Sequence, residues 1–517
     1  MGCGPLPSGG GPFLFDGLAR VRYGWLHMSI EFKTKPFPHQ LAEFNDHKED
    51  PSWGLLWEPG CGKTWPALNE AAHLEDAGEI KGMMVLAPNG VHRNWAVDQI
   101  PTHLPQELLE RTRVVQWQTS KSKNKGHQAM AAAALADPGF VIVCMSYDAV
   151  MTTEGGKFWK AFLNSRRTMY VLDESPRIKT PGSKRSKRIT GSCKAAPYRR
   201  ILTGTIVDDK PFDVYNQIRF LDPMAWHEVG CSDFGAFKNT FGVWRSQQVS
   251  DGRGGMREFP MLVSFRNLEL LQQIVAKYGS RLRKEDVLDL PPKMYSKRYF
   301  EMTPAQRRAY KDIQTEFYTF LESGEMVSAD LVITRMLRLQ QITSGYLPGD
   351  ADGETLVQIG DTNPRIKLLI ECVEDTEGQQ VIVWAKYRQD ITAILAALAD
   401  AKISAVRYDG QCNETEMGNA IDSFKAGNAQ VFVANPAKGS DGITLTCAKT
   451  MIYFNNGYRL SQRTQSEDRF HRIGQTDPVH IIDLAAVDTV DTAIIDILRR
   501  KQELASFVQG DEIKTWI

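Results

Sequence analysis

One stretch, WEPGCGKT, constrains the fold of this chain more than any other. An apolar run ends at Trp57, and glycines follow at Gly60 and Gly62. A helix-forming segment begins directly after Lys63 and Thr64. In such a loop, backbone N–H groups cradle phosphate oxygens, the lysine reaches the β- and γ-phosphates, and the threonine hydroxyl holds Mg²⁺. The match is to the looser end of the motif, because Trp57 stands where the strict motif has glycine. The alternative interpretation is therefore a glycine turn with a surface lysine.

A glutamine upstream of this loop, Gln40, is a second candidate contact for the nucleotide. Its side-chain amide can donate and accept a hydrogen bond at once, which the edge of adenine requires. The alternative is a polar residue on an amphipathic helix. We therefore expect ATP and Mg²⁺ as the ligands of this region, with Gln40 as the candidate adenine contact.

Apolar runs alternate with helix-forming segments after the loop. Continuous apolar strands separated by helices are typical of an α/β domain, in which helices cover both faces of a parallel sheet. Ligands bind such sheets at the carboxyl ends of the strands. The runs lie at 83–86, 141–145, 169–172 and 200–202.

The acidic pair Asp173 and Glu174 directly follows the third of these runs. An aspartate at a strand end can hold the Mg²⁺ that bridges the β- and γ-phosphates. The adjacent glutamate can orient and deprotonate the attacking water. The alternative is a solvated strand end, but a position downstream of a phosphate loop favours the catalytic interpretation.

A basic segment with six Lys and Arg residues between Arg177 and Arg188 comes next. The whole chain has 62 basic and 62 acidic residues, so no overall positive field attracts nucleic acid. Any such site must therefore be a local groove. The basic segment is either part of a phosphate-binding track for DNA or a solvated face, and both interpretations stay open at this point.

A second α/β unit without a phosphate loop is predicted from about Asn363 onward. The eight cysteines of the chain are scattered, which favours a reducing compartment over structural zinc. No run of 18 apolar residues exists, so we expect no membrane-spanning segment. The strands of the second unit are expected at 381–384, 403–408, 431–434, 451–454 and 479–483.

Several motifs, taken in order, resemble those of the Snf2-like branch of superfamily 2 helicases. The resemblance runs from about Phe37 to about Leu484 and implies two tandem RecA-like α/β lobes with helical insertions. Several motifs in the right order are far more specific than any one of them. They are DESPRIKTPGSK, LTGTIVDD, YNQIRFLDP, RLRKEDVLDLPPK and EDRFHRIGQTDPV.

The resemblance and the composition together suggest how the chain is divided. Aromatic residues punctuate the expected helical projection of the first lobe, where they either pack or stack on bases, and packing is favoured. The expected parts are a disordered tail at 1–30, a first lobe at 31–286 with a helical projection at 210–286, a link at 287–300, and a second lobe at 301–517 with a helical projection at 303–345.

Gln465, Arg469 and Arg472 fall at the spacing i, i+4 and i+7, which predicts one helix face, and Gly474 is placed to end that helix. From spacing alone, a basic solvated helix is the default. The resemblance implies that Arg469 and Arg472 are arginine fingers for the ATP held by the first lobe, since arginine suits bidentate phosphate contact. It also adds Gln465 and Gly442 as nucleotide contacts.

Five further residues are candidate nucleic-acid contacts by similarity, although each also suits an ordinary loop. They are Asn89, Ser146, Lys386, Gly410 and Thr444.

Three motifs depart from the family pattern. The departures are Ser175–Pro176 for Ala-His, Ile206–Asp209 for Pro-Leu-Gln-Asn, and Asp441 with Thr444 for Leu and Asn. In the segment Ile206–Asp209, Asp208 or Asp209 is still expected to cap a helix that begins near Pro211.

The function implied by the resemblance is a DNA-stimulated ATPase that translocates on double-stranded DNA. We expect a monomeric motor with little beyond its two lobes, in a bacterial cytoplasm or a phage-infected host. One rival is a strand-separating DNA or RNA helicase. The other is an ATPase that displaces or recycles a DNA-bound protein partner such as RNA polymerase.

Overall fold

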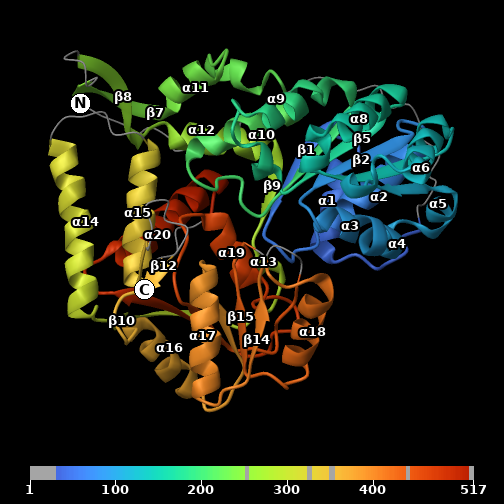
Figure 1. Ribbon diagram of the computed structural model, residues 1–517. Helices are drawn as coiled ribbons and strands as arrows, with labels where there is room; N and C mark the ends of the chain where they lie inside the picture. The colour runs from blue at the N-terminus through green and yellow to red at the C-terminus, as the bar shows by residue number, and fades with distance from the viewer. Residues whose placement is uncertain (1–30, 251–255, 323–328, 349–355, 438–442, 512–517) are drawn as a thin grey trace, which may run out of the picture. The chain divides into compact units, whose positions relative to one another are not determined.

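The computed structural model describes residues 31–250, 256–322, 329–348, 356–437 and 443–511. The tail predicted at 1–30 lies outside these ranges. Within them the chain forms two parallel sheets, each packed with helices, so the predicted fold class of two α/β lobes is confirmed (Figure 1).

The first lobe is built on a parallel sheet with the strand order β3-β4-β2-β5-β6-β1-β9. β2 and β4 are buried along their whole length, as continuous apolar runs predict. The strands are β1 (Ser52–Trp57), β2 (Gly82–Ala87), β3 (Arg113–Gln116), β4 (Val141–Ser146), β5 (Thr168–Asp173), β6 (Tyr198–Leu202) and β9 (Gly279–Leu282).

This strand order brings three loops together. β6 lies between β5 and β1, and all three run in the same direction. Their carboxyl ends therefore meet at one edge of the sheet, so the segments after Trp57, Asp173 and Leu202 are neighbours.

The helices of the first lobe connect these strands and cover the sheet. They are α1 (Pro38–His47), α2 (Thr64–Asp76), α3 (Val91–Asn94), α4 (Ile100–His103), α5 (Gln106–Arg111), α6 (Lys125–Ala136), α7 (Tyr147–Met151), α8 (Thr153–Ser165), α9 (Lys184–Gly191), α10 (Val214–Leu221), α11 (Phe234–Phe241), α12 (Leu268–Lys277) and α13 (Lys284–Val287).

The second lobe has a parallel sheet with the order β10-β17-β16-β13-β15-β14. Its strands are β10 (Lys293–Phe300), β13 (Val381–Trp384), β14 (Ala405–Tyr408), β15 (Val431–Ala434), β16 (Thr450–Tyr453) and β17 (Val479–Ala486). Its helices are α14 (Pro304–Glu322), α15 (Ala329–Thr343), α16 (Pro364–Glu374), α17 (Arg388–Asp400), α18 (Glu414–Lys425), α19 (Leu460–Asp468) and α20 (Val490–Gln509). A short hairpin, β11 (Tyr346–Pro348) with β12 (Leu356–Gln358), follows α15, and α14 and α15 lie side by side (Figure 1).

Two predicted segments differ from the structure. The link predicted at 287–300 contains β10, which pairs along its whole length with β17, so the second sheet begins at Lys293. The projection predicted as helical at 210–286 contains an antiparallel hairpin of β7 (Gly242–Ser250) and β8 (Met256–Phe265). β10 is decided by pairing with a strand that is distant in the chain, whereas β7 and β8 are consecutive strands that pair with each other. In both segments strand pairing overrides the local pattern.

The aromatic residues of this projection pack rather than face solvent. Trp226, Phe237 and Phe241 are buried in the core of the first lobe. The Trp226 and Phe237 ring centroids are 4.6 Å apart in an edge-to-face arrangement. The packing interpretation is therefore confirmed for these three residues.

Candidate active site

The phosphate loop lies between β1 and α2, as the sequence predicts. Gly60 and Gly62 both adopt left-handed backbone conformations, with φ of 93° and 76°, which favour glycine. The Lys63 ammonium donates hydrogen bonds to the carbonyl oxygens of Trp57 at 2.8 Å and Glu58 at 3.3 Å. α2 begins at Thr64, so the helix N-terminus faces the loop.

Gln40 braces this loop from α1. Its Nε2 donates to the Gly62 carbonyl oxygen at 2.9 Å, and its Oε1 accepts from the Phe37 N–H at 2.8 Å. A Cβ at position 62 would lie 2.3 Å from the same Nε2, so a side chain there would displace the Gln40 amide in addition to straining the left-handed backbone. The chain engages both ends of the amide, which gives Gln40 a loop-positioning role that sequence reasoning missed.

Asp173 is the last residue of β5 and is held by an aromatic residue that sequence reasoning missed. The indole N–H of the buried Trp95 donates to the Asp173 carboxylate at 2.8 Å. The Tyr147 hydroxyl donates to the Asp173 carbonyl oxygen at 2.9 Å. Burial raises the pKa of Asp173, against the opposing effects of the Trp95 hydrogen bond and the Lys63 charge. No local pattern marks Trp95, because only the fold brings it to this strand end.

Glu174 has a strained backbone, with φ of 55° and ψ of 58°. Its N–H donates to the Leu202 carbonyl oxygen at 2.8 Å, which extends the pairing of β5 with β6 and holds this conformation. Burial and the Asp173 charge raise the pKa of Glu174 to about 7, whereas Lys63 and Arg469 lower it. The Arg469 charge belongs to the second lobe, so that lobe contributes to the electrostatics of this carboxylate.

The helix that carries Gln465 is shorter than predicted. α19 ends at Asp468, so Arg469 and Arg472 do not share a helix face with Gln465, and Gly474 is not its stop signal. The Arg469 carbonyl oxygen accepts from the Leu445 N–H at 2.8 Å instead of from the next helical turn. The prediction of one continuous helix through Arg472 is therefore wrong, because this tertiary hydrogen bond replaces the helical one.

A cavity of about 420 Å³ joins the two lobes at this point. Among the predicted site residues that the structure describes, Glu174 and Gln465 line it. Its first-lobe wall comes from the phosphate loop, the Glu174 segment and the loop after β6. Its second-lobe wall comes from α19, the residue before it and the loop after β15. The lining residues include Pro59, Glu174, Arg177, Thr205 and Asp208 on one side and Pro436, Arg459, Ser461, Thr464 and Gln465 on the other.

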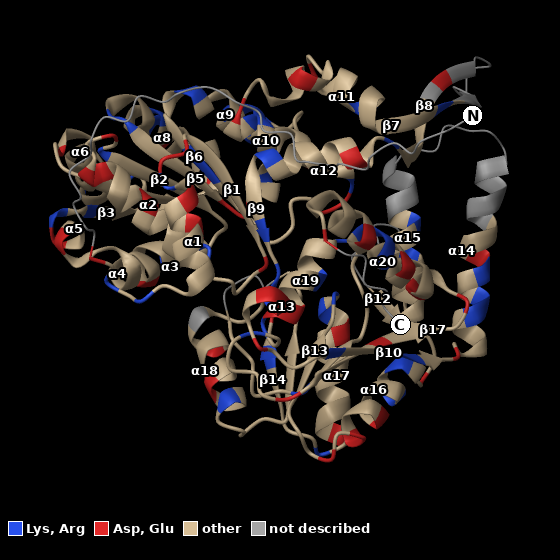
Figure 2. Cartoon of the chain, turned by 180° about the vertical axis from the view of Figure 1, so that it is seen from behind, with Lys and Arg blue, Asp and Glu red and all other residues tan. Residues whose placement is uncertain are grey.

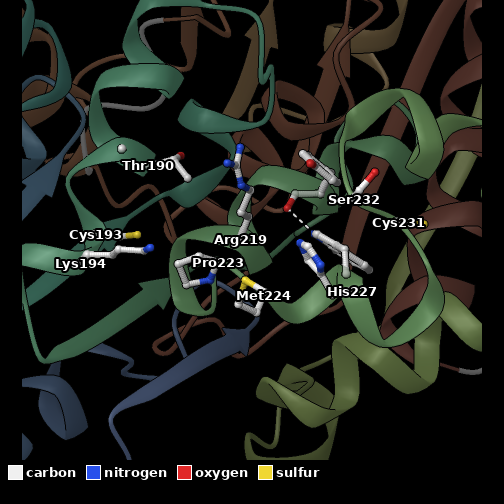
Figure 3. A pocket seen from close by; sticks show the side chains of 12 residues that line it. Thr190, Cys193, Lys194, Arg219, Pro223, Met224, His227, Cys231 and Ser232 are labelled. Carbon is white, nitrogen blue, oxygen red and sulfur yellow. Dashed lines mark hydrogen bonds between the residues drawn. The ribbon is translucent and has the colours of Figure 1, made fainter.

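A second cavity, of about 370 Å³, belongs to the first lobe alone. Figure 3 shows Lys194, Arg219 and His227 among the side chains around it. None of the predicted site residues within the described ranges lines this cavity. It is therefore separate from the site built around the phosphate loop.

The first-lobe candidates for nucleic-acid contact differ in their surroundings. Asn89 is exposed after β2, and its amide donates to the Asp148 carboxylate at 3.3 Å. Ser146 is buried, and its hydroxyl caps α7 by accepting from the Ala149 N–H at 3.1 Å. Ser146 thus has a structural role, whereas Asn89 lies at the surface.

The second-lobe candidates for nucleic-acid contact also differ in their surroundings. The Lys386 ammonium donates to the Gln340 side chain at 2.8 Å, and burial lowers the pKa of Lys386 to about 8. Gly410 is exposed after β14. The Thr444 hydroxyl accepts from the Arg472 guanidinium at 2.9 Å. Gly442, the remaining predicted nucleotide contact of this lobe, lies outside the described residues.

A glycine-rich loop between strand and helix in one parallel-sheet lobe, and a cavity that this lobe shares with a second parallel-sheet lobe, define the two-lobed helicase architecture. The SNF2-related domain family matches residues 45–345, and the helicase conserved C-terminal domain matches residues 364–474. The chain belongs to the SNF2-related family.

Curated proteins are similar to most of this chain. The mouse DNA annealing helicase and endonuclease ZRANB3 is 24% identical over 86% of this chain and 38% of its own length. The mouse SWI/SNF-related matrix-associated actin-dependent regulator of chromatin subfamily A member 1 is 26% identical over 88% of this chain and 41% of its own length. The chain thus spans about two fifths of these relatives. The solved structure of the Sulfolobus solfataricus SWI2/SNF2 ATPase core in complex with dsDNA is 22% identical, with a TM-score of 0.39, and the match covers 93% of this chain and 94% of that one.

Proposed function

We propose that this protein is an ATP-dependent DNA translocase of the Snf2 type, which hydrolyses ATP to move along double-stranded DNA. The observation that carries the proposal is the cavity between the lobes, which Glu174 of the first lobe and Gln465 of the second lobe both line. An active site shared by two lobes couples hydrolysis to their relative movement. Family membership supports DNA as the track.

Each residue of the site has a role in this proposal. Lys63 binds the β- and γ-phosphates, and the left-handed glycines let the loop backbone approach them. Glu174 accepts a proton from the attacking water. Arg469 and Arg472 stabilise the charge that develops on the transferred phosphoryl group, an effect worth about 10³-fold or more in rate.

The Mg²⁺ site fits the residues that are present. Thr64 is the first residue of α2, which follows β1, and Asp173 is the last residue of β5. β5 lies two strands from β1 in the sheet, so both side chains lie at the same edge. Oxygen ligands of this kind suit Mg²⁺, which neutralises phosphate charge when it is bound. Trp95 orients the Asp173 carboxylate through its indole N–H.

The basic helix α9 supports contact with a phosphate backbone. Lys and Arg residues gather on it (Figure 2), and Lys184 and Lys187 are exposed. Other members of the basic segment are engaged within the chain, because Lys179 pairs with Asp208 and Arg185 with Asp148. We therefore assign the exposed lysines of α9, rather than the whole segment, to the DNA track.

The test is ATP hydrolysis measured in parallel without nucleic acid and with double-stranded DNA, single-stranded DNA and RNA, at one salt concentration. We expect double-stranded DNA to stimulate hydrolysis most. Displacement of a triplex strand without unwinding of the duplex would support translocation. Strand separation on a tailed duplex would identify a helicase instead, and stimulation by a DNA-bound protein more than by DNA would identify a protein-displacing ATPase.

A further inference from the structure

We propose that Asp208, in the first lobe, is the helix cap of α19 in the second lobe, and that it positions Gln465 and Arg469 against Glu174. Asp208 lies in the loop after β6, where the sequence departs from the family pattern. The effect on catalysis rests on the proposed function, whereas the cap itself does not. Asp208 is thus a positioning residue rather than a catalytic one.

α19 has no side-chain cap of its own. Arg459 occupies the N-cap position and makes no capping hydrogen bond with its side chain. Instead, Oδ1 of Asp208 accepts from the Ser461 N–H, in the first turn of the helix, at 2.9 Å. Carboxylates are favoured at this position because they satisfy a free N–H and face the positive end of the helix. The sequence predicted that Asp208 or Asp209 caps the helix at Pro211, but Asp208 caps a helix of the other lobe.

The Asp208 carboxylate is held rigidly on the first-lobe side. The Lys179 ammonium donates to its other oxygen, Oδ2, at 2.6 Å. The Asp208 N–H donates to the Asp213 carboxylate at 3.1 Å. Asp208 is nearly buried, with 6% of its surface exposed. Lys179 follows Glu174 closely in the chain, so the cap is tied to the segment that carries the catalytic carboxylate.

A second contact supports the same helix start. The Lys501 ammonium, on α20, donates to the Asp209 carboxylate at 2.7 Å. The same ammonium donates to the Tyr458 carbonyl oxygen at 2.8 Å, directly before the N-cap Arg459. The loop after β6 therefore binds the first turn of α19 directly through Asp208, and Lys501 links the same loop to the residue that leads into the helix.

The other end of α19 is also attached to the first lobe. Lys284 forms an ion pair with Asp468, the last residue of the helix. It also donates to the His471 carbonyl oxygen at 2.9 Å. Gln465 and Arg469 thus lie in a segment that the first lobe holds at both ends. A displacement of about 1 Å in such a segment can lower a rate by about a hundredfold.

The proposal predicts a loss of turnover without a matching loss of ATP affinity. Asp208→Ala removes the acceptor, and Ser461→Pro removes the donor at a first-turn position that tolerates proline. Each change should lower kcat in the presence of DNA by about tenfold to a hundredfold. The KM for ATP should change much less, because the phosphate loop is untouched. Asp208→Asn keeps an oxygen acceptor and should recover most of kcat.

A matched control is Gln389→Pro, which places proline in the exposed first turn of α17 in the same lobe. It should leave kcat unchanged. An equal loss of kcat in Gln389→Pro and Ser461→Pro would overturn the positioning role. So would wild-type kcat in Asp208→Ala.

Hydrogen exchange measures the cap without any activity. In the wild-type protein the amides of the first turn of α19 should exchange slowly, and Asp208→Ala should speed the exchange of the Ser461 amide by about tenfold or more. Asp208→Asn should restore most of the protection. Unchanged exchange in Asp208→Ala would overturn the inference even if ATP hydrolysis is DNA-stimulated. Absence of hydrolysis in the wild-type protein would overturn the proposed function and leave the exchange result to decide the cap.

Discussion

The Lys284 ammonium and the Asp468 carboxylate form an ion pair that joins the two lobes beside the phosphate loop. Their side chains are only 6% and 7% exposed. The Lys284 N–H also donates to the Glu58 carboxylate at 2.9 Å, within the phosphate-loop motif. The residue that ends α19, next to Arg469, is therefore attached to the predicted phosphate loop.

Lys284→Met should destabilise the protein strongly. The substitution leaves the Asp468 carboxylate buried without its partner, which costs about 3–5 kcal/mol in the free energy of unfolding. Urea denaturation measures the change. The control is Lys277→Met, because the Lys277 and Glu228 side chains of that ion pair are 59% and 57% exposed. The control should cost less than about 1 kcal/mol, and equal losses in the two variants would contradict the prediction.

Glu174→Gln should abolish most hydrolysis while ATP binding persists. The amide keeps the shape of the side chain but cannot accept the proton of the attacking water, so the rate should fall by about 10²–10⁴-fold. Single-turnover hydrolysis and equilibrium ATP binding separate the two effects. Glu154→Gln, at an exposed carboxylate of α8 paired with Lys157, should keep the wild-type rate. Near-normal hydrolysis in Glu174→Gln would remove this residue from the catalytic role.

Trp95→Phe should raise the Mg²⁺ concentration that hydrolysis requires. The change keeps most of the buried ring and removes the 2.8 Å hydrogen bond to the Asp173 carboxylate. Loss of such an orienting contact weakens metal binding by about 10–100-fold. Titration of Mg²⁺ at saturating ATP measures the shift. Trp159→Phe removes a buried indole hydrogen bond to Tyr170, away from the site, and should leave the Mg²⁺ titration unchanged.

Asp390→Asn should flatten the pH dependence of stability. Burial raises the pKa of Asp390 from its ordinary 3.8 to about 7, so the folded chain keeps a proton that the unfolded chain loses. The stabilisation that this proton gives is complete below pH 4 and is lost as the pH rises through 7. Between pH 5 and pH 7 the free energy of unfolding should fall by about 2 kcal/mol from this group.

Denaturation midpoints of both proteins at pH 5 and pH 7 check this sign. The wild-type protein should lose more stability than Asp390→Asn on going to pH 7. Asp400→Asn, at an exposed position that ends α17, should follow the wild-type protein. A steeper loss in Asp390→Asn than in the wild-type protein would contradict the assigned direction.

The local parts of the site follow from the sequence. The turn of Gly60 and Gly62 needs left-handed conformations that only glycine adopts readily, so its pattern marks the phosphate loop. Asp173 and Glu174 follow an apolar run, and the parallel sheet places such residues at the ligand-binding edge. The contacts of Trp95 with Asp173 and of Gln40 with Gly62 have no comparable signature, because these partners are distant in the chain. The end of α19 also differs from the prediction, because the Arg469 carbonyl oxygen accepts a hydrogen bond from the Leu445 N–H and not from a further helical turn.

The sequence by itself determined the two α/β lobes, the phosphate loop and the acidic strand end, because backbone preference and the period of apolar residues are encoded over a few neighbouring residues. Only the tertiary structure decided that Lys293–Phe300 is a strand beside β17, that Arg469 acts on Glu174, and that Asp208 caps a helix of the other lobe. These contacts join residues that are far apart in the chain. Their partners are selected by the order of strands in each sheet and by the packing of α19 and α20, which no local pattern specifies.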